Sequence, residues 1–217
     1  MREFADSAGD PPIRGFLHEP EQPDGRALVL THGAGGDCQS RLLVSLGVAF
    51  AERGFLVLRC DLPFRLERRH GPPFSGNAER DRQGLQRAVK VMQERTAGPI
   101  YLGGHSYGGR QASMLAADEP NLVKALLLLS YPLHPPRRPE QLRTAHFPRL
   151  STPAMFVHGS RDPFASQEEI NSALALLPAA HKLLELEGRG HDLLGRGAGQ
   201  VLVAQIVDAF HTFINAG

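Results

Sequence analysis

Short apolar runs alternate along the chain with longer segments of helical periodicity, and this alternation restricts the fold more than any other feature. The runs are brief, rich in Val, Leu and Ile, and bounded by Gly, Pro or Asp, as is typical of strands. They cover residues 27–31, 55–60, 100–103, 125–130, 154–158 and 182–186. Because the runs are apolar at nearly every position, they predict strands that are buried on both faces of a parallel sheet.

The segments between the runs space their apolar residues as helices do, so we expect them to cover the sheet. They are residues 39–53, 78–94, 109–118, 167–177 and 200–215. Residues 14–18 are predicted to add an antiparallel edge strand. A regular β–α alternation over 217 residues favours a doubly wound, mostly parallel sheet flanked by helices, since a barrel would need eight such units.

Length and composition limit the number of domains and the classes of partner. A chain of 217 residues is predicted to form a single domain over residues 1–217. The 24 Lys and Arg residues nearly cancel the 23 Asp and Glu residues, so no net field attracts nucleic acid or anionic lipid. The first dozen residues lack the apolar core of a secretory signal, and no apolar run approaches the ~20 residues of a membrane helix. We therefore expect a cytoplasmic protein without nucleic-acid or membrane partners.

The two cysteines, Cys38 and Cys60, fit neither a CxxC pair nor the spacing of a zinc site. They are predicted to be small packing residues. Neither a metal nor an organic cofactor is expected from the sequence.

Two irregular stretches, residues 62–77 and 133–152, are rich in Pro and Arg and follow strand ends, where open α/β sheets bind ligands. Arg65, Arg68 and Arg69 in the first stretch are predicted to form a solvated cluster, with attraction of acidic substrates as the alternative. The second stretch is too short for a cap domain, so the site is expected to be shallow and open. Its candidate lining residues are His32, Gly33, Phe64, Phe74, Tyr107, Tyr131, Leu133 and Phe164.

Residues 104–108, Gly-His-Ser-Tyr-Gly, match the pattern G-x-S-x-G between a predicted strand and a predicted helix. A sharp strand-to-helix turn strains the backbone of the central serine, and side chains two positions to either side would collide. Gly104 and Gly108 remove those collisions. Ser106 is therefore the predicted nucleophile, and the N–H of Tyr107, at a helix N-terminus, is a predicted oxyanion donor.

A serine hydroxyl needs a histidine to accept its proton and an acid to orient that histidine. Asp162 follows the run 154–158, and His191 follows the last run, which gives the chain order Ser, Asp, His. We predict that His191 is the base and that Asp162 is the acid that orients it. Asp192, Glu187 and Asp61 remain open as alternative acids, and His105 and His158 are expected to pack beside the site.

The glycine-rich residues 32–37, His-Gly-Ala-Gly-Gly-Asp, follow the strand predicted at 27–31. Their spacing is not G-x-G-x-x-G and no P-loop lysine follows, which disfavours nucleotide binding. The loop is predicted to provide the second oxyanion donor. The backbone N–H of Ala34 is the first candidate, with Gly33 and Gly35 as alternatives.

The segments 31–36, 103–110, 131–136 and 159–164 together resemble the small α/β-hydrolase-fold proteins of the dienelactone-hydrolase-like group. The chain is most similar to a bacterial branch of predicted hydrolases related to a testis-expressed eukaryotic protein and to a chromatin-complex subunit. The resemblance implies an α/β-hydrolase fold and a serine hydrolase acting on a small acyl substrate. Dienelactone hydrolases proper use a cysteine nucleophile, whereas this chain has Ser106.

Three functions follow from the motifs and the resemblance. The first is cleavage of a small carboxylic ester through an acyl-enzyme. The second is cleavage of a thioester or a peptide on the same residues. The third is a binding module without turnover, because some eukaryotic relatives serve as scaffolds.

Overall fold

The computed structural model describes residues 1–74, 76–195 and 199–216. Within them, one sheet of eight strands has the order β1-β2-β4-β3-β5-β6-β7-β8. The strands are β1 (Arg2–Asp6), β2 (Ile13–His18), β3 (Ala27–Thr31), β4 (Leu56–Cys60), β5 (Ile100–His105), β6 (Ala125–Leu129), β7 (Ala154–Gly159) and β8 (His181–Leu186). Strands β3 to β8 pair in parallel, and β1 and β2 are antiparallel. The predicted, mostly parallel sheet is therefore confirmed.

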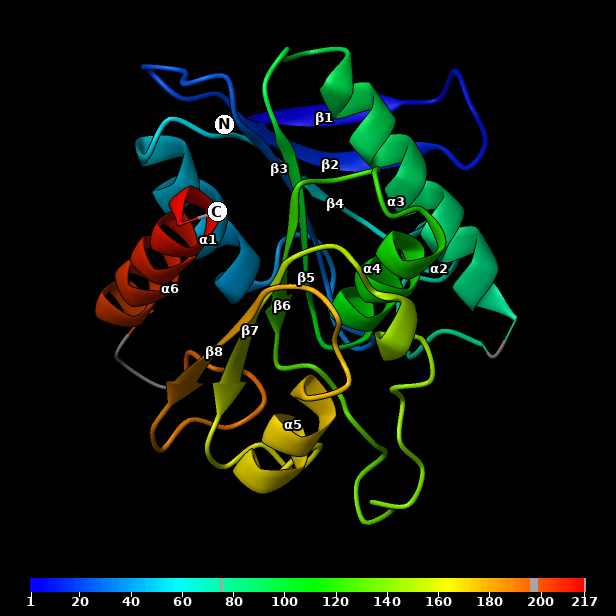
Figure 1. Cartoon of the computed structure of the whole chain (residues 1–217). Coiled ribbons are helices and arrows are strands. Elements are labelled where there is room, and N and C mark those ends of the chain that lie inside the picture. Colours follow the sequence, from blue (N-terminus) through cyan, green and yellow to red (C-terminus); the bar gives the residue numbers. More distant parts are fainter. Residues whose placement is uncertain (75, 196–198, 217) are drawn as a thin grey trace.

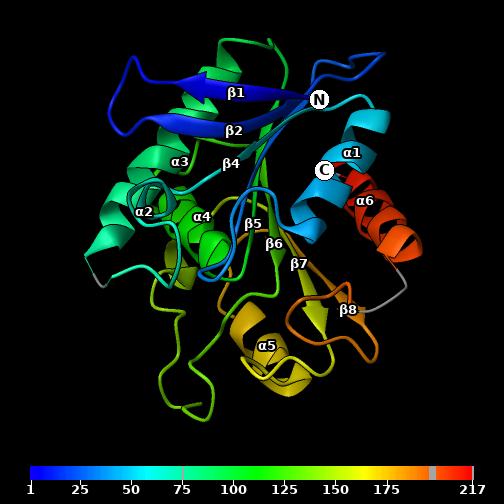
Figure 2. The ribbon, with the colours of Figure 1, turned by 180° about the vertical axis from the view of Figure 1, so that it is seen from behind.

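Helices cover both faces of this sheet. They are α1 (Arg41–Glu52), α2 (Pro63–Glu67), α3 (Asn77–Gln93), α4 (Tyr107–Asp118), α5 (Gln167–Leu174) and α6 (Gly199–Asn215), with the 3-10 helix η1 (Phe147–Arg149). Figures 1 and 2 show α1 and α6 side by side on one face, and α2, α3 and α4 on the other. This is the three-layer arrangement expected from the β–α alternation.

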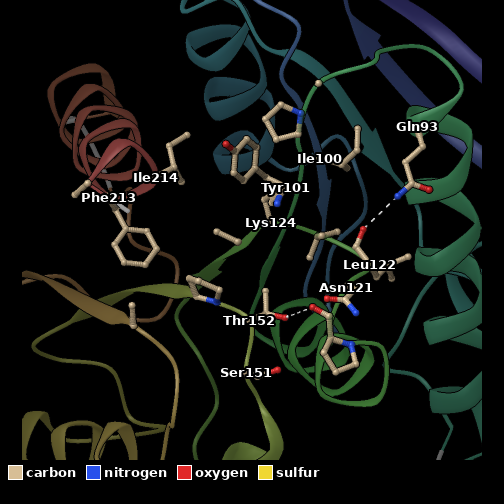
Figure 3. Close-up of a pocket in the computed structure, with 18 residues that line it drawn as sticks. Gln93, Ile100, Tyr101, Asn121, Leu122, Lys124, Ser151, Thr152, Phe213 and Ile214 are labelled. Atoms are coloured by element: carbon tan, nitrogen blue, oxygen red, sulfur yellow. Dashed lines mark hydrogen bonds between the residues drawn. The ribbon is translucent and has the colours of Figure 1, made fainter.

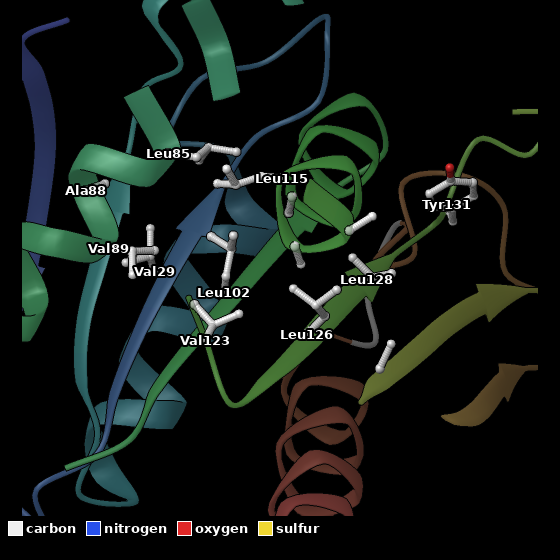
Figure 4. Packing of buried hydrophobic residues seen from close by; sticks show 14 of the residues in the cluster. Val29, Leu85, Ala88, Val89, Leu102, Leu115, Val123, Leu126, Leu128 and Tyr131 are labelled. Carbon is white, nitrogen blue, oxygen red and sulfur yellow. The ribbon is translucent and has the colours of Figure 1, made fainter. Parts of the chain in front are cut away.

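The sheet divides the buried apolar residues into two cores. Leu126 and Leu128 of β6 point toward α3 and α4 (Figure 4), whereas Leu127 and Leu129 of the same strand pack on the side of α1 and α6. Successive side chains of a strand point to opposite faces, so a strand covered on both faces must be apolar at every position. This explains the continuous apolar runs in the sequence.

The amino-terminal edge of the sheet differs from the prediction. Strand β2 is antiparallel to β4, as expected, but it is not the edge, because β1 pairs along its outer side. In β1 only Phe4 is buried. A strand whose other residues face water carries no apolar run, so the sequence pattern does not reveal it.

Two further differences lie at the ends of β5 and β4. Strand β5 continues to His105 and α4 begins at Tyr107, so Ser106 alone separates the two elements. Helix α2 lies in the stretch predicted to be irregular. It has five residues and begins at Pro63, a residue favoured in the first helical turn, but so short a helix shows no periodicity.

No helix among the residues described here has the length and apolar character needed to cross a bilayer. Cys38 and Cys60 are buried free thiols, as predicted for packing residues.

Three histidines are held in surroundings that disfavour their charged form. Burial lowers the pKa of His18, His105 and His146 to about 4 from the usual 6.5. His18 Nε2 accepts a hydrogen bond of 2.8 Å from the guanidinium Nε of Arg59, and His146 Nε2 lies 2.8 Å from the hydroxyl of Ser113. The native state therefore keeps these imidazoles neutral where an unfolded chain would protonate them.

We predict that the free energy of unfolding falls as the pH is lowered from 6.5 toward 4. In this window the unfolded chain binds more protons than the native one, so each histidine removes up to about 1.4 kcal/mol per pH unit. Urea unfolding at pH 7 and pH 5 measures the effect. In His18→Gln the dependence should become shallower, and equal stability of the wild type at both pH values would contradict the prediction.

Candidate active site

The predicted nucleophile lies at the carboxyl end of β5. Ser106 is the residue before the first turn of α4 and has φ of 51° and ψ of −116°, a region that residues other than glycine rarely adopt. Its N–H donates a 2.8 Å hydrogen bond to the carbonyl of Leu129 on β6. The strained turn is thus tied to the neighbouring strand.

Three glycines allow this turn to close. A Cβ on Gly104 would lie 2.5 Å from the carbonyl carbon of Gly108, and a Cβ on Gly109 would lie 2.6 Å from the carbonyl oxygen of Gly104. A Cβ on Gly108 would lie 2.5 Å from the carbonyl oxygen of His32. The neighbours are backbone atoms, which cannot move aside as a flexible side chain can.

Ser106, His191 and Asp162 form a hydrogen-bonded line across three strand ends. His191 Nε2 lies 2.8 Å from Ser106 Oγ, and His191 Nδ1 lies 2.8 and 3.0 Å from the two carboxylate oxygens of Asp162. A carboxylate only accepts hydrogen bonds, so Nδ1 carries the proton and Nε2 is left to accept from the serine hydroxyl. The Asp162 side chain is fully buried, whereas that of His191 is 23% exposed.

The loops that carry Asp162 and His191 are joined along their backbones. The N–H of Arg161 donates to the carbonyl of Arg189 (2.8 Å), and Ser160 Oγ accepts from the N–H of Gly188 (2.8 Å). A Cβ on Gly159 would lie 2.4 Å from the carbonyl oxygen of Arg189. The close approach of β7 and the loop after β8 therefore requires the glycine at this position.

His105 and Phe164 hold His191 from two sides. His105 Nε2 donates to the backbone carbonyl of His191 (2.8 Å), and its low pKa keeps it neutral. The rings of Phe164 and His191 are tilted by 34° to each other, with centroids 4.2 Å apart. His158 Nε2 donates to the carbonyl of Ala165 and so fixes the loop that contains Phe164.

The alternative acids do not contact His191. Asp192 and Glu187 are exposed, and both contacts of His191 Nδ1 within the described residues are with Asp162. The carboxylate of Asp61 accepts from the N–H of Cys38 (2.8 Å) and pairs with Arg14 (3.1 Å). Asp61, which directly follows β4, thus holds the segment after β3 through Cys38.

The glycine-rich loop lies directly against Ser106, the predicted nucleophile. A Cβ on Gly33 would lie 3.3 Å from Ser106 Cβ. The backbone N–H groups of Ala34 and Tyr107 donate to no acceptor among the residues that the structure describes. Two N–H groups, one in the residue after Ser106 and one in the residue after Gly33, are therefore available to an oxygen atom bound at this point.

The residues predicted to line a pocket lie in three kinds of position. Gly33 and Phe164 border the Ser106–His191 line, as described above. His32, Phe64, Tyr131 and Leu133 are buried, at 1% exposure or less, and support the loops from beneath. Phe74 is 67% exposed. The hydroxyl of Tyr131 donates to the carbonyl of Arg143, and the ring of Phe64 packs edge-on against that of Tyr107.

Sequence reasoning did not find Asp81. Its carboxylate accepts 2.7 Å from the Tyr107 hydroxyl and 2.9 Å from the N–H of Phe64, and burial raises its pKa. Asp81 shares the buried face of α3 with Leu85 and Ala88. A lone carboxylate on the apolar stripe of a helix was the signal that could have identified it.

The prediction that Arg65, Arg68 and Arg69 form a solvated cluster is only partly correct. Arg68 and Arg69 are exposed, as expected for a solvated loop, but the prediction is wrong for Arg65, which is 6% exposed. Arg65 donates to backbone carbonyls. Because two of these acceptors, the carbonyls of Ala34 and Gly36, lie in a loop distant in sequence, no local pattern distinguishes Arg65 from its neighbours.

A groove of about 910 Å³ opens at the opposite edge of the sheet, where β5, β6 and β7 begin. Figure 3 shows that residues of α6 and of these strand starts surround it, among them Tyr101, Lys124, Thr152, Phe213 and Ile214. Ser106 lies at the far ends of the same strands. Within the described ranges, no three His, Cys, Asp or Glu side chains gather as a metal site would require.

Comparisons with known proteins agree with this architecture. Residues 24–215 match the family described as "Alpha/beta hydrolase domain". The structure of Est1E from Butyrivibrio proteoclasticus with bound ferulic acid is similar, with a TM-score of 0.78 and 19% identity over 95% of this chain and 96% of that one. Dienelactone hydrolase from Anabaena variabilis has a TM-score of 0.77 and 20% identity over 98% of both chains.

A Xanthomonas campestris protein described as an a/b serine hydrolase without lid is also similar, with a TM-score of 0.72 and 14% identity over 100% of this chain and 95% of that one. At such identities the likeness shows the fold alone. The predicted α/β-hydrolase fold without a cap domain is confirmed for the described residues.

We predict that Gly104→Ala destabilises the fold by about 1–3 kcal/mol or more, because the new methyl group meets the backbone of residues 108 and 109. Urea unfolding measures the change. Gly36→Ala is the matched control, since the nearest atom to a Cβ at that position lies 3.9 Å away. Equal loss of stability in the two variants would contradict this account of the turn.

Proposed function

The chain belongs to the alpha/beta hydrolase family, and from that premise we propose that it is a serine hydrolase that cleaves small carboxylic esters through an acyl-enzyme. The observation that carries the proposal is the hydrogen-bonded line from Ser106 through His191 to the buried carboxylate of Asp162. Such a line supplies a nucleophile, a base and a group that orients the base.

In the first step Ser106 Oγ attacks the ester carbonyl carbon while His191 Nε2 takes the hydroxyl proton. The carboxylate of Asp162 holds Nδ1–H and stabilises the imidazolium that forms. The carbonyl oxygen becomes an oxyanion, which the N–H groups of Tyr107 and Ala34 stabilise. Neither N–H has an acceptor among the described residues, and Gly33, next to Ala34, lies against Ser106; both observations support this role.

In the second step the tetrahedral intermediate collapses. His191 returns the proton to the leaving alcohol, the C–O bond to that alcohol breaks, and the acyl group stays on Ser106. Water then attacks the acyl carbon and gives one proton to His191. The bond between the acyl carbon and Ser106 Oγ breaks, His191 returns the proton to Oγ, and the acid is released with the enzyme in its starting form. No redox partner or external electron source is needed.

Small acyl substrates suit the site because it has no cap domain and its histidine is partly open to solvent. Est1E, one of the similar structures, holds ferulic acid, which is a small carboxylic acid. We further propose that the chain belongs to the bacterial branch that its motifs resemble, and that the protein acts in the cytoplasm. Thioester or peptide cleavage would use the same residues.

The wild-type protein should hydrolyse p-nitrophenyl acetate or butyrate, and Ser106→Ala should reduce turnover to the background rate because it removes the attacking oxygen. Spectrophotometric release of p-nitrophenol measures both. Ser151→Ala is the matched control, since this exposed serine lies beside the groove at the opposite sheet edge and its loss should not change turnover.

A panel of acyl esters, thioesters and amides extends the same assay to the leaving group. Equal inertness of the wild type and Ser106→Ala across the panel would refute the enzyme proposal. That result would favour a binding module without turnover.

A further inference from the structure

Arg65 is a buried cation whose hydrogen bonds, within the described residues, all go to backbone carbonyls. On one side its Nε donates to the carbonyl of Gly36 (2.8 Å), and one terminal nitrogen donates to that of Ala34 (2.9 Å). On the other side it donates to the carbonyls of Arg68 and Gly71, each at 3.1 Å. None of its contacts within the described residues is with a carboxylate.

A buried guanidinium is costly to desolvate, and replacing such a group by apolar residues often leaves stability unchanged or improved. Its planar fork can, however, fix several acceptors in one geometry, which an apolar side chain cannot do. The acceptors of Arg65 are therefore informative about its role. Two of the four belong to the loop of residues 33–36, which lies against Ser106.

The carbonyl of one residue and the N–H of the next share one planar peptide unit and point in opposite directions. By holding the carbonyl of Ala34, Arg65 therefore directs the N–H of Gly35 away from α2. The contact is charge-assisted, which makes it stronger than a hydrogen bond between neutral groups.

The preceding peptide is held by His32. The N–H of Leu62 donates to His32 Nε2 (3.0 Å), so the ring proton lies on Nδ1, and Nδ1 donates to the carbonyl of Gly33 (2.9 Å). Burial lowers the pKa of His32, which keeps this neutral form. The Gly33 carbonyl belongs to the peptide that carries the N–H of Ala34. The two consecutive peptide units that begin with the carbonyls of Gly33 and Ala34 are thus each fixed by a hydrogen bond to the carbonyl.

We infer that Arg65 is a positioning residue for the oxyanion loop, which it orders before the substrate binds by holding the carbonyls of Ala34 and Gly36. This inference rests on the proposed function, because it assigns the loop to oxyanion stabilisation. Arg65 does not touch the substrate. Its loss should therefore affect the transition state, where the oxyanion forms, more than the binding of the neutral ester.

The test compares Arg65→Gln and Arg65→Lys with Arg69→Gln, which removes the same charge from an exposed position four residues later. With p-nitrophenyl butyrate, kcat of Arg65→Gln should fall about 10- to 100-fold, with KM changed less than about threefold. Arg65→Lys should lie in between, since an ammonium cannot reproduce the planar fork. Arg69→Gln should match the wild type.

Counting the active sites separates an effect on positioning from an effect on folding. Active sites are counted by titration with a fluorophosphonate, and kcat is expressed per active site. If the loss in Arg65→Gln disappears after this correction, or if KM rises while kcat is unchanged, the inference is wrong. If Arg65→Gln does not fold, Arg65→Lys carries the comparison.

Amide spectroscopy tests the inference without turnover. In ¹H–¹⁵N spectra and relaxation, the amides of Ala34, Gly35 and Asp37 should shift and become more mobile in the Arg65 variants but not in Arg69→Gln. Unchanged amides in the Arg65 variants would overturn the inference. If the wild type does not cleave any ester, the proposed function fails, and these amides still decide whether Arg65 orders the loop.

Discussion

Between β5 and α4 the chain reverses direction around Ser106, and three positions in this turn have no space for a Cβ. The strain at Ser106 persists because β5 is buried on both faces of the sheet and α4 packs firmly on one of them. The turn sets the serine hydroxyl above the sheet, at the carboxyl ends of the strands. The loops after β3, β7 and β8 begin at these same ends. The other site residues must therefore reach the position at which this turn holds Ser106.

Around the turn, the polar groups are fixed before any ligand arrives. Asp162 is buried and holds the tautomer of His191, His105 holds the backbone of His191, and His32 and Arg65 hold the loop after β3. Preorganised dipoles need not rearrange when charge develops, and this accounts for much of the rate enhancement in enzymes that stabilise oxyanions. His105, which is buried and neutral in this arrangement, is also one of the histidines predicted to weaken the fold in acid.

The sequence predicted the parallel sheet well because strands covered on both faces must be apolar at every position, as β6 is. It also predicted the three residues that the structure brings into one hydrogen-bonded line, because each follows a strand and these strands end at one edge. Strand β1 escaped prediction because only Phe4 of it is buried. Arg65 was misjudged because its role depends on carbonyls about thirty residues away, which composition and spacing do not encode.

The most direct test of the account is the rate at which a fluorophosphonate labels the protein, with the adduct located by mass spectrometry of its peptides. If Asp162 orients His191 toward Ser106, the adduct forms on Ser106, and Asp162→Asn slows labelling by about 10³- to 10⁴-fold. Asp192→Asn, which changes the exposed neighbour of the histidine, should label at the wild-type rate. Labelling at another residue, or an unchanged rate in Asp162→Asn, would contradict the account.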